Sequence, residues 1–259
     1  MTDTPTKDLP MRADYHIHLH HSPCTADEMT VDAVVAEAGR CGLEEIGLID
    51  HLHPNTESAI FRQARSEITG LGGEFSGRIL LGAELDLLDQ DGNTTFRPDV
   101  AEAVDFLSLG MGHYQLGWVT ADLTQPPDRF LEREAESLIR ALERHRVSVV
   151  VHPFIYVAFP KLAPHYVGAL WPDRLPPALI DTLADVLIAR NTAMEFHCRD
   201  LIHIPQRLGG EPFVTSYMAL LDVLREKGVH FVSGSDAHRL NQIHRSAEAP
   251  DWARNRLPI

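Results

Sequence analysis

The stretch Asp14-Tyr15-His16-Ile17-His18 places two histidines two residues apart at the end of a short apolar run. Successive side chains of a β-strand point to opposite faces, so His16 and His18 would lie on the same face. Two imidazoles on one face can bind the same metal ion. Because a His-x-His pair also occurs by chance in a chain with 15 histidines, its meaning depends on whether similar clusters recur.

Similar polar clusters do recur, each at the end of another apolar run. They are Asp50-His51, Glu84, His113, His152, Glu195 with His197, and Asp236 with His238. The apolar runs predict strands at residues 13–17, 45–49, 78–85, 104–109, 147–151, 193–196 and 229–233. The segments between them predict helices at residues 30–41, 56–70, 128–145, 179–189 and 213–227.

This alternation of strands and helices indicates the fold. Seven strands separated by helices predict a parallel sheet, and polar clusters at the carboxyl ends of the strands predict a closed or nearly closed barrel with its site on that face. We therefore expect an α/β protein with one domain, a distorted seven-stranded (β/α)7 TIM-like barrel at residues 11–259 that follows a mobile tail at residues 1–10. The proline-rich residues 159–177 are expected to form a loop or a lid over the site.

The composition limits the classes of function. Hydrophobic residues make up 44% of the chain and charged residues 23%, as in ordinary globular proteins, and no apolar run approaches the roughly 20 residues that cross a bilayer. The first residues lack the apolar core of a secretory signal, so we expect a cytoplasmic protein without a membrane partner. Three cysteines make no disulfide framework. A net charge of −14 argues against a surface that binds nucleic acid.

The clustered residues are ligands that divalent metal ions of intermediate hardness prefer. Such ions take imidazole nitrogens and carboxylate oxygens, and one carboxylate can bridge two ions. An isolated glutamate at a strand end is usually a solvated charge. Glu84, however, ends an apolar strand, where burial of a carboxylate is costly unless it is compensated. We therefore expect Glu84 to be the bridging ligand, and His113 and His152 to complete the surroundings of a second ion.

In their order along the chain, these residues resemble the motif series of the polymerase and histidinol phosphatase (PHP) domain family, over roughly residues 13–240. The resemblance implies a distorted seven-stranded barrel that holds two or three divalent ions of zinc, iron or manganese. It implies three groups of ligands: His16, His18, Glu84 and Asp236 for one ion; Glu84, His113 and His152 for a second; and His51 with His238 for the third.

One position departs from the family pattern. Family members usually carry another histidine six residues beyond the second residue of the His-x-His pair, and this chain has Cys24 there. A thiolate can bind zinc or iron, so Cys24 either replaces the histidine or is a spectator beside a weak or empty third site. His20, His21 and His53 lie close enough in sequence to support the ligands.

The expected function is that of a metal-dependent phosphoesterase, a phosphatase-like hydrolase that acts on a small phosphorylated metabolite. A hydroxide bridging the ions would be the nucleophile, and Asp236 or His238 would assist proton transfer. Arg199 and His197 are the candidate substrate-binding residues, and the alternative for Arg199 is a surface arginine. Histidinol phosphate is the first substrate to test, because one branch of the resembling family uses it.

Two other functions stay open. The first is a nuclease or phosphodiesterase, as in other branches of the family, against which the acidic charge and the lack of a basic stripe argue. The second is a non-catalytic metal-binding scaffold, as in relatives that have lost ligands. Nearly all ligand positions are filled here, which favours an enzyme.

Overall fold

The sheet of this protein contains seven parallel strands in sequence order, β1-β2-β3-β4-β5-β6-β7. The computed structural model describes residues 12–73 and 75–259, so the tail expected at residues 1–10 lies outside the described residues. The strands are β1 (Ala13–His18), β2 (Glu45–Leu52), β3 (Arg78–Asp86), β4 (Phe106–Gly110), β5 (Val149–Val151), β6 (Ala193–His197) and β7 (Phe231–Gly234).

The sheet closes where the chain beyond β7 meets β1. Ile17 and Ala237 form a parallel bridge. The amide of His18 donates to the carbonyl of Ala237 at 3.0 Å, and the amide of Ala237 donates to the carbonyl of His16 at 3.2 Å. The predicted single-domain, nearly closed TIM-like barrel is therefore confirmed, and its closure brings the first and last polar clusters of the chain together.

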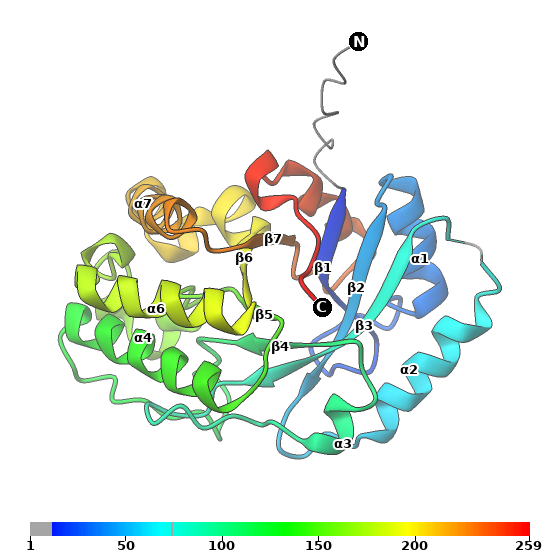
Figure 1. Cartoon of the computed structure of the whole chain (residues 1–259), viewed down its shortest axis with the longest axis horizontal. Helices are drawn as coiled ribbons and strands as arrows, with labels where there is room; N and C mark the ends of the chain where they lie inside the picture. Colours follow the sequence, from blue (N-terminus) through cyan, green and yellow to red (C-terminus); the bar gives the residue numbers. More distant parts are fainter. Residues whose placement is uncertain (1–11, 74) are drawn as a thin grey trace, which may run out of the picture.

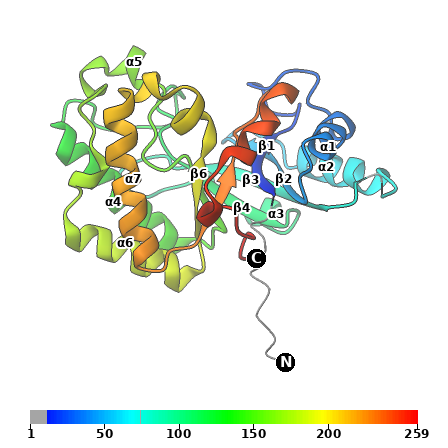
Figure 2. The same ribbon diagram turned by 90° about the horizontal axis from the view of Figure 1, so that it is seen from above.

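The helices lie around this sheet (Figures 1 and 2). They are α1 (Val31–Arg40), α2 (Ala59–Gly70), α3 (Pro98–Ala101), α4 (Pro127–Arg144), α5 (Phe159–Leu162), α6 (Pro177–Arg190) and α7 (Glu211–Glu226). In both views α1 and α2 lie on one side of the strands, and α4, α6 and α7 lie on the other. Thr30 begins α1, because its side chain accepts a hydrogen bond from the amide of Ala33.

Short helical turns form most of the remaining connections. They are η1 (Pro164–Tyr166), η2 (Pro172–Arg174), η3 (Arg199–His203), η4 (Pro205–Leu208), η5 (Leu240–Glu248) and η6 (Asp251–Ala253). The proline-rich residues 159–177 are therefore more regular than the sequence indicated, since they contain α5, η1 and η2. Phe159 and Tyr166 are buried with ring centroids 5.1 Å apart, so this segment packs into the core rather than forming a loose loop.

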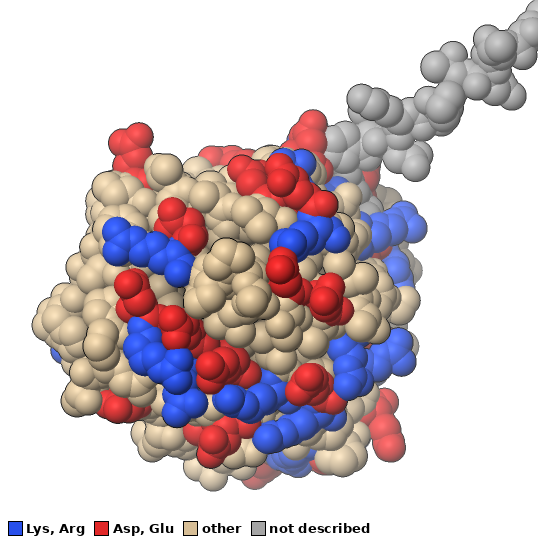
Figure 3. Space-filling view, turned by 60° about the vertical axis from the view of Figure 1, so that its left-hand side comes forward, with Lys and Arg blue, Asp and Glu red and all other residues tan. Residues whose placement is uncertain are grey.

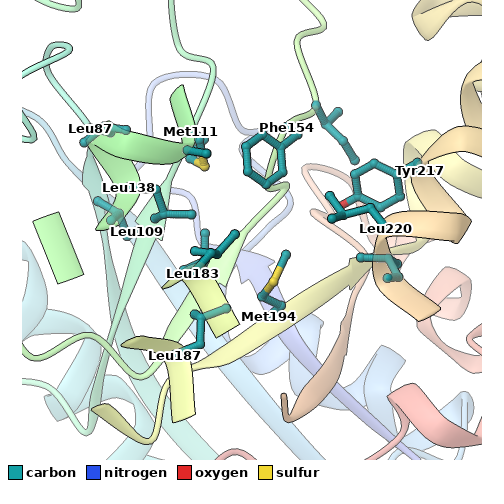
Figure 4. Close-up of a cluster of buried hydrophobic side chains, with 14 of the residues drawn as sticks. Leu87, Leu109, Met111, Leu138, Phe154, Leu183, Leu187, Met194, Tyr217 and Leu220 are labelled. Carbon is teal, nitrogen blue, oxygen red and sulfur yellow. The ribbon is translucent and has the colours of Figure 1, made fainter. Parts of the chain in front are cut away.

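The larger core lies between the sheet and α4, α6 and α7 (Figure 4). Leu138 of α4, Leu183 of α6 and Leu220 of α7 are all buried in it, together with Met194 of β6. Burying each such side chain contributes about 1.5–3 kcal/mol. This packing fixes the positions of β4, β5 and β6, whose carboxyl ends carry part of the candidate site.

The surface carries charges of both signs. On the face drawn in Figure 3, basic and acidic side chains alternate rather than gather into a stripe. Ion pairs along α4 are of this mixed kind, including Arg133 with Glu136 and Arg140 with Glu136. Over the residues that the structure describes, no helix combines the length and the apolar character needed to cross a membrane.

Candidate metal centre

Glu84 lies near the end of β3 and is fully buried among imidazoles. Its Oε1 lies 3.0 Å from His152 Nε2 and 3.6 Å from His113 Nε2. Its Oε2 lies 3.0 Å from His51 Nδ1 and 3.4 Å from His18 Nε2. The two oxygens of one carboxylate thus face two different groups of histidines, which is the arrangement that a bridging ligand needs.

Backbone register and a glycine allow this placement of Glu84. His51 of β2 pairs directly with Glu84 of β3, so the two side chains start from neighbouring positions on the sheet. A Cβ atom at Gly110 would lie only 2.4 Å from Glu84 Oε1. Glycine at the end of β4 therefore leaves the space that the carboxylate occupies.

The deepest part of the site is formed where β1 meets the chain after β7. His16 Nε2 and His18 Nε2 are 3.0 Å apart, and Asp236 Oδ1 lies 3.4 Å from the first and 3.2 Å from the second. All three residues are buried. The expected grouping of the opening pair with Asp236 is therefore present in space, with Glu84 Oε2 3.6 Å from His16 Nε2.

Two residues of this site have strained backbones. His152 has φ of 34° and Asp236 has φ of 49°, values that non-glycine residues seldom adopt. Such strain costs on the order of 1–3 kcal/mol and persists where the surroundings fix the conformation. Strain at two neighbouring members of one cluster is typical of a functional site.

Glu195 of β6 orients the histidines on one side of the cluster. Its Oε1 accepts a hydrogen bond from His16 Nδ1 at 2.7 Å, and its Oε2 accepts from the amide of His152 at 2.6 Å. The neutral ring of His16 would therefore carry its proton on Nδ1 and turn the lone pair of Nε2 toward His18 and Asp236. A Cβ atom at Gly234 would lie 1.8 Å from Glu195 Oε1, so this position also needs glycine.

Asp86 of β3 orients histidines on the other side of the cluster. This residue was not identified from the sequence. Its Oδ1 accepts from His113 Nδ1 at 2.9 Å, and its Oδ2 accepts from His53 Nδ1 at 2.8 Å and from Trp118 Nε1 at 2.9 Å. Asp86 follows Glu84 by two residues on one strand. The i and i+2 rule that singled out His16 and His18 could have found it.

The pKa values of the cluster follow from this crowding of acids and imidazoles. Burial would raise the pKa of Glu84, but the charge of His51 and hydrogen bonds from neighbouring imidazoles hold it well below its usual range. Burial would lower the pKa of His16, but the charges of Glu195 and Asp236 raise it well above its ordinary value. The carboxylates therefore stay ionised and attract positive charge into the centre of the cluster.

A cavity of about 230 Å³ opens beside the cluster. Among its lining residues are Cys24, His51, His113, Arg199, Asp236 and His238. Cys24 is exposed as a residue, and although partial desolvation of its thiol would raise the pKa, hydrogen bonds and charge from His238 and His51 lower the pKa to about 6. Cys24 thus lies beside the two histidines with which the sequence grouped it.

Arg199 and His197, the two predicted substrate-binding residues, lie in different surroundings. Arg199 lines the cavity, where its guanidinium pairs with Asp236 and, at 2.8 Å, with Asp200. His197 is fully buried, and its ring nitrogens bond Glu195 at 2.9 Å and Asp200 at 2.7 Å. Both ring nitrogens are therefore occupied by carboxylates in the described structure, and His197 is not among the residues that line the cavity.

The described residues suit divalent cations. His18 Nδ1, His51 Nδ1 and Glu84 Oε2 are buried polar atoms without a hydrogen-bond partner in the described structure. Lone pairs also face one another, since His113 donates from Nδ1 to Asp86 and turns Nε2 toward Glu84 Oε1 at 3.6 Å. Acceptors that face one another across such distances repel unless a cation lies between them. Groups that could hold one ion include His16, His18 and Asp236; His16, Glu84 and His152; and His18, His51 and His238.

Comparisons with known proteins give little further information. No protein-family model matches the sequence, and the comparison with curated proteins finds no match. Among solved structures, the chain is similar to dihydroorotase from Campylobacter jejuni, with 14% identity and a TM-score of 0.39 over 88% of this chain and 70% of that chain. At this identity and score the likeness assigns no activity, and the fold described above rests on strand order and barrel closure.

Proposed function

We propose that this protein is a metal-dependent phosphoesterase that hydrolyses a small phosphate monoester, similar to the histidinol phosphatases of the PHP family. The observation that carries the proposal is the position of Glu84. One buried carboxylate turns Oε1 toward His152 and Oε2 toward His51, and Oε2 and His51 Nδ1 have no hydrogen-bond partner among the described residues. This arrangement suits two adjacent cations bridged by one glutamate.

The ligand sets that the resemblance to the PHP family implies would hold the cations, and the contacts of Glu84 fit the first two of these sets. The set His16, His18, Glu84 and Asp236 would hold one ion; Glu84, His113 and His152 would hold a second; and His51, His238 and Cys24 would hold a third. Bound divalent cations would attract the phosphate group, lower the pKa of a water molecule and stabilise negative charge on the departing oxygen.

His238 is placed to move a proton. Its Nδ1 donates to the backbone carbonyl of Asp236 at 2.9 Å, so Nε2 carries the lone pair. The side chain is 22% exposed and lines the cavity, so where no third ion is bound to Nε2 this nitrogen can exchange protons with a bound ester. The carboxylate of Asp236, whose Oδ1 lies 3.4 Å from His238 Nδ1, stabilises the protonated ring.

Arg199 would orient the phosphate. Asp200 holds its Nε and Nη2 at 2.8 Å, which fixes the plane of the guanidinium at the cavity wall. A planar cation suits the oxygens of a phosphate monoester. A cavity of about 230 Å³ favours a small phosphorylated metabolite over a polymer.

A reconstitution screen tests this proposal. The purified chain is stripped with a chelator, loaded with Mn²⁺, Zn²⁺ or Fe²⁺, and assayed for phosphate release from histidinol phosphate, sugar phosphates and nucleoside monophosphates, with bis-p-nitrophenyl phosphate as a diester. We expect metal-dependent hydrolysis of at least one monoester and slower cleavage of the diester. Cleavage of the diester alone would favour a nuclease, and a protein that binds metal but cleaves no ester would overturn the proposal.

A further inference from the structure

A second group of histidines lies outside the set that surrounds Glu84. His20 and His21 occupy the turn that follows β1, and Glu67 lies near the end of α2. The ring centroids of the two histidines are 4.0 Å apart, and His21 Nε2 lies 3.9 Å from Glu67 Oε2. One donor atom from each of the three residues lies within 4.8 Å of the others.

The nitrogens of this group lack partners. His20 Nδ1 and His21 Nε2 are buried, and neither forms a hydrogen bond with any described residue. The His21 side chain is only 8% exposed, and the 3.9 Å to Glu67 is longer than a hydrogen bond. Leaving such a buried nitrogen unpaired costs about 1–3 kcal/mol, so the arrangement needs a reason.

We propose that His20, His21 and Glu67 form a separate site for one divalent transition-metal ion of the zinc class. Ligands about 2.0–2.2 Å from a tetrahedral ion lie about 3.4 Å from one another. The gap of 3.9 Å between His21 and Glu67 therefore closes with a shift of about half an ångström. Two imidazoles and one carboxylate favour zinc, cobalt or nickel over calcium or magnesium, which prefer oxygen ligands.

The proposed site lies next to a segment of the chain that lines the cavity. Pro23 and Cys24, which follow His21 by two and three residues, line the cavity beside Glu84. An ion held by His21 and Glu67 would tie the start of this segment to α2. The segment is already fixed by Ser22, whose hydroxyl donates to Asp50 Oδ1 at 2.7 Å. The ion would thus be structural, and its binding does not depend on the proposed phosphoesterase activity.

Metal analysis of four full-length proteins tests the site. Zn²⁺ content and Co²⁺ titration, followed by visible absorption, are measured for the wild type, His21→Ala, Glu67→Gln and the control His165→Ala, in which an exposed histidine is removed. We expect His21→Ala and Glu67→Gln each to lose one equivalent of tightly bound metal, or to bind it at least about tenfold more weakly. His165→Ala should match the wild type.

The same measurements in a Glu84→Gln background separate this site from the main cluster. One equivalent of metal that remains in Glu84→Gln but is lost in the double variant Glu84→Gln/His21→Ala belongs to the site formed by His20, His21 and Glu67. Equal metal content in the wild type and in the three single variants would overturn the proposal. If His21→Ala fails to fold, Glu67→Gln decides, because Glu67 is 32% exposed on a surface helix and its loss leaves no buried charge.

Discussion

Two buried glutamates of this protein have opposite surroundings. Glu84, at the centre of the candidate metal centre, is fully buried among imidazoles, and their charge and hydrogen bonds overcome burial and hold its pKa well below the usual range. Glu134 of α4 is 2% exposed, and burial raises its pKa to about 7. Its neighbour Tyr114 donates a hydrogen bond to it.

The difference shows that burial alone does not identify a metal ligand. Glu134 borders tyrosines, including Tyr114 and Tyr156, whose own pKa values burial and the charge of Glu134 raise well above the ordinary value. A carboxyl group whose pKa is raised toward 7 favours its protonated form, and beside protonated phenols it needs no cation. Glu84 instead lies among imidazoles, whose charge and hydrogen bonds favour the anion. The neighbours of a buried acid therefore decide whether it holds a proton or a metal ion.

The largest effect is expected for Glu84→Gln. Glutamine keeps the shape but cannot bridge two cations, so bound metal should fall by at least one equivalent and phosphate monoester hydrolysis by about 10³-fold, because metal ions supply several kcal/mol to such reactions. Metal content and kcat are measured together. Glu102→Gln, on an exposed position, is the control. Hydrolysis by Glu84→Gln at the wild-type rate would show that Glu84 is not the bridging ligand.

A smaller effect, on stability alone, is expected for Glu134→Gln. A buried acid with a raised pKa binds more protons in the folded than in the unfolded state between pH 4.5 and about 7, so the free energy of unfolding falls as the pH rises through this interval. The loss approaches about 3 kcal/mol at most. Glutamine still accepts a hydrogen bond from Tyr114 and does not ionise.

Denaturant unfolding of the wild type and Glu134→Gln at pH 5 and pH 8 measures this contribution. The variant should gain stability relative to the wild type at the higher pH, with metal content and kcat unchanged. Parallel pH dependences of the two proteins would show that Glu134 does not titrate as its surroundings indicate.

The smallest effect is expected for Glu195→Gln. Glu195 is not among the residues that line the cavity and would act through His16, whose Nδ1 donates to it at 2.7 Å. Replacing such a supporting acid typically weakens metal binding by about 10–100-fold. Activity should therefore recover at saturating metal, unlike that of Glu84→Gln. A loss of kcat that excess metal does not restore would assign Glu195 a more direct role.

Most of the fold was predictable because each strand is an apolar run that ends in polar residues. The same rule placed His16, Glu84 and Asp236 at the carboxyl ends of their strands, on one face of the barrel. Local patterns gave less accurate boundaries, since β2 continues through Asp50 and His51 to Leu52, and β5 begins only at Val149. The prediction of a loop or lid at residues 159–177 was inaccurate, because the prolines there begin short helical turns that pack into the core.

The supporting residues were harder to predict because their roles depend on contacts between distant strands. His197 was predicted to bind substrate, but Glu195 and Asp200, the latter from the following turn, occupy its two ring nitrogens. His20 and His21 were expected to support the ligands after β1, yet they lie close to Glu67 on α2. Sequence spacing shows which side chains share a strand face and cannot show which helix packs against them.

The closure of the barrel also sets the order in which the candidate centre is built. The amide of Ser235 donates to Asp14 Oδ1 at 3.0 Å across 221 residues of sequence. At about 5–20 residues per second, a ribosome needs roughly 10 to 45 seconds to make the chain between them. During that time the nascent chain displays His16, His18 and Glu84 without Asp236. The proposed ion beside Asp236 would therefore have its full set of ligands only after synthesis has passed β7 and the last strand has docked.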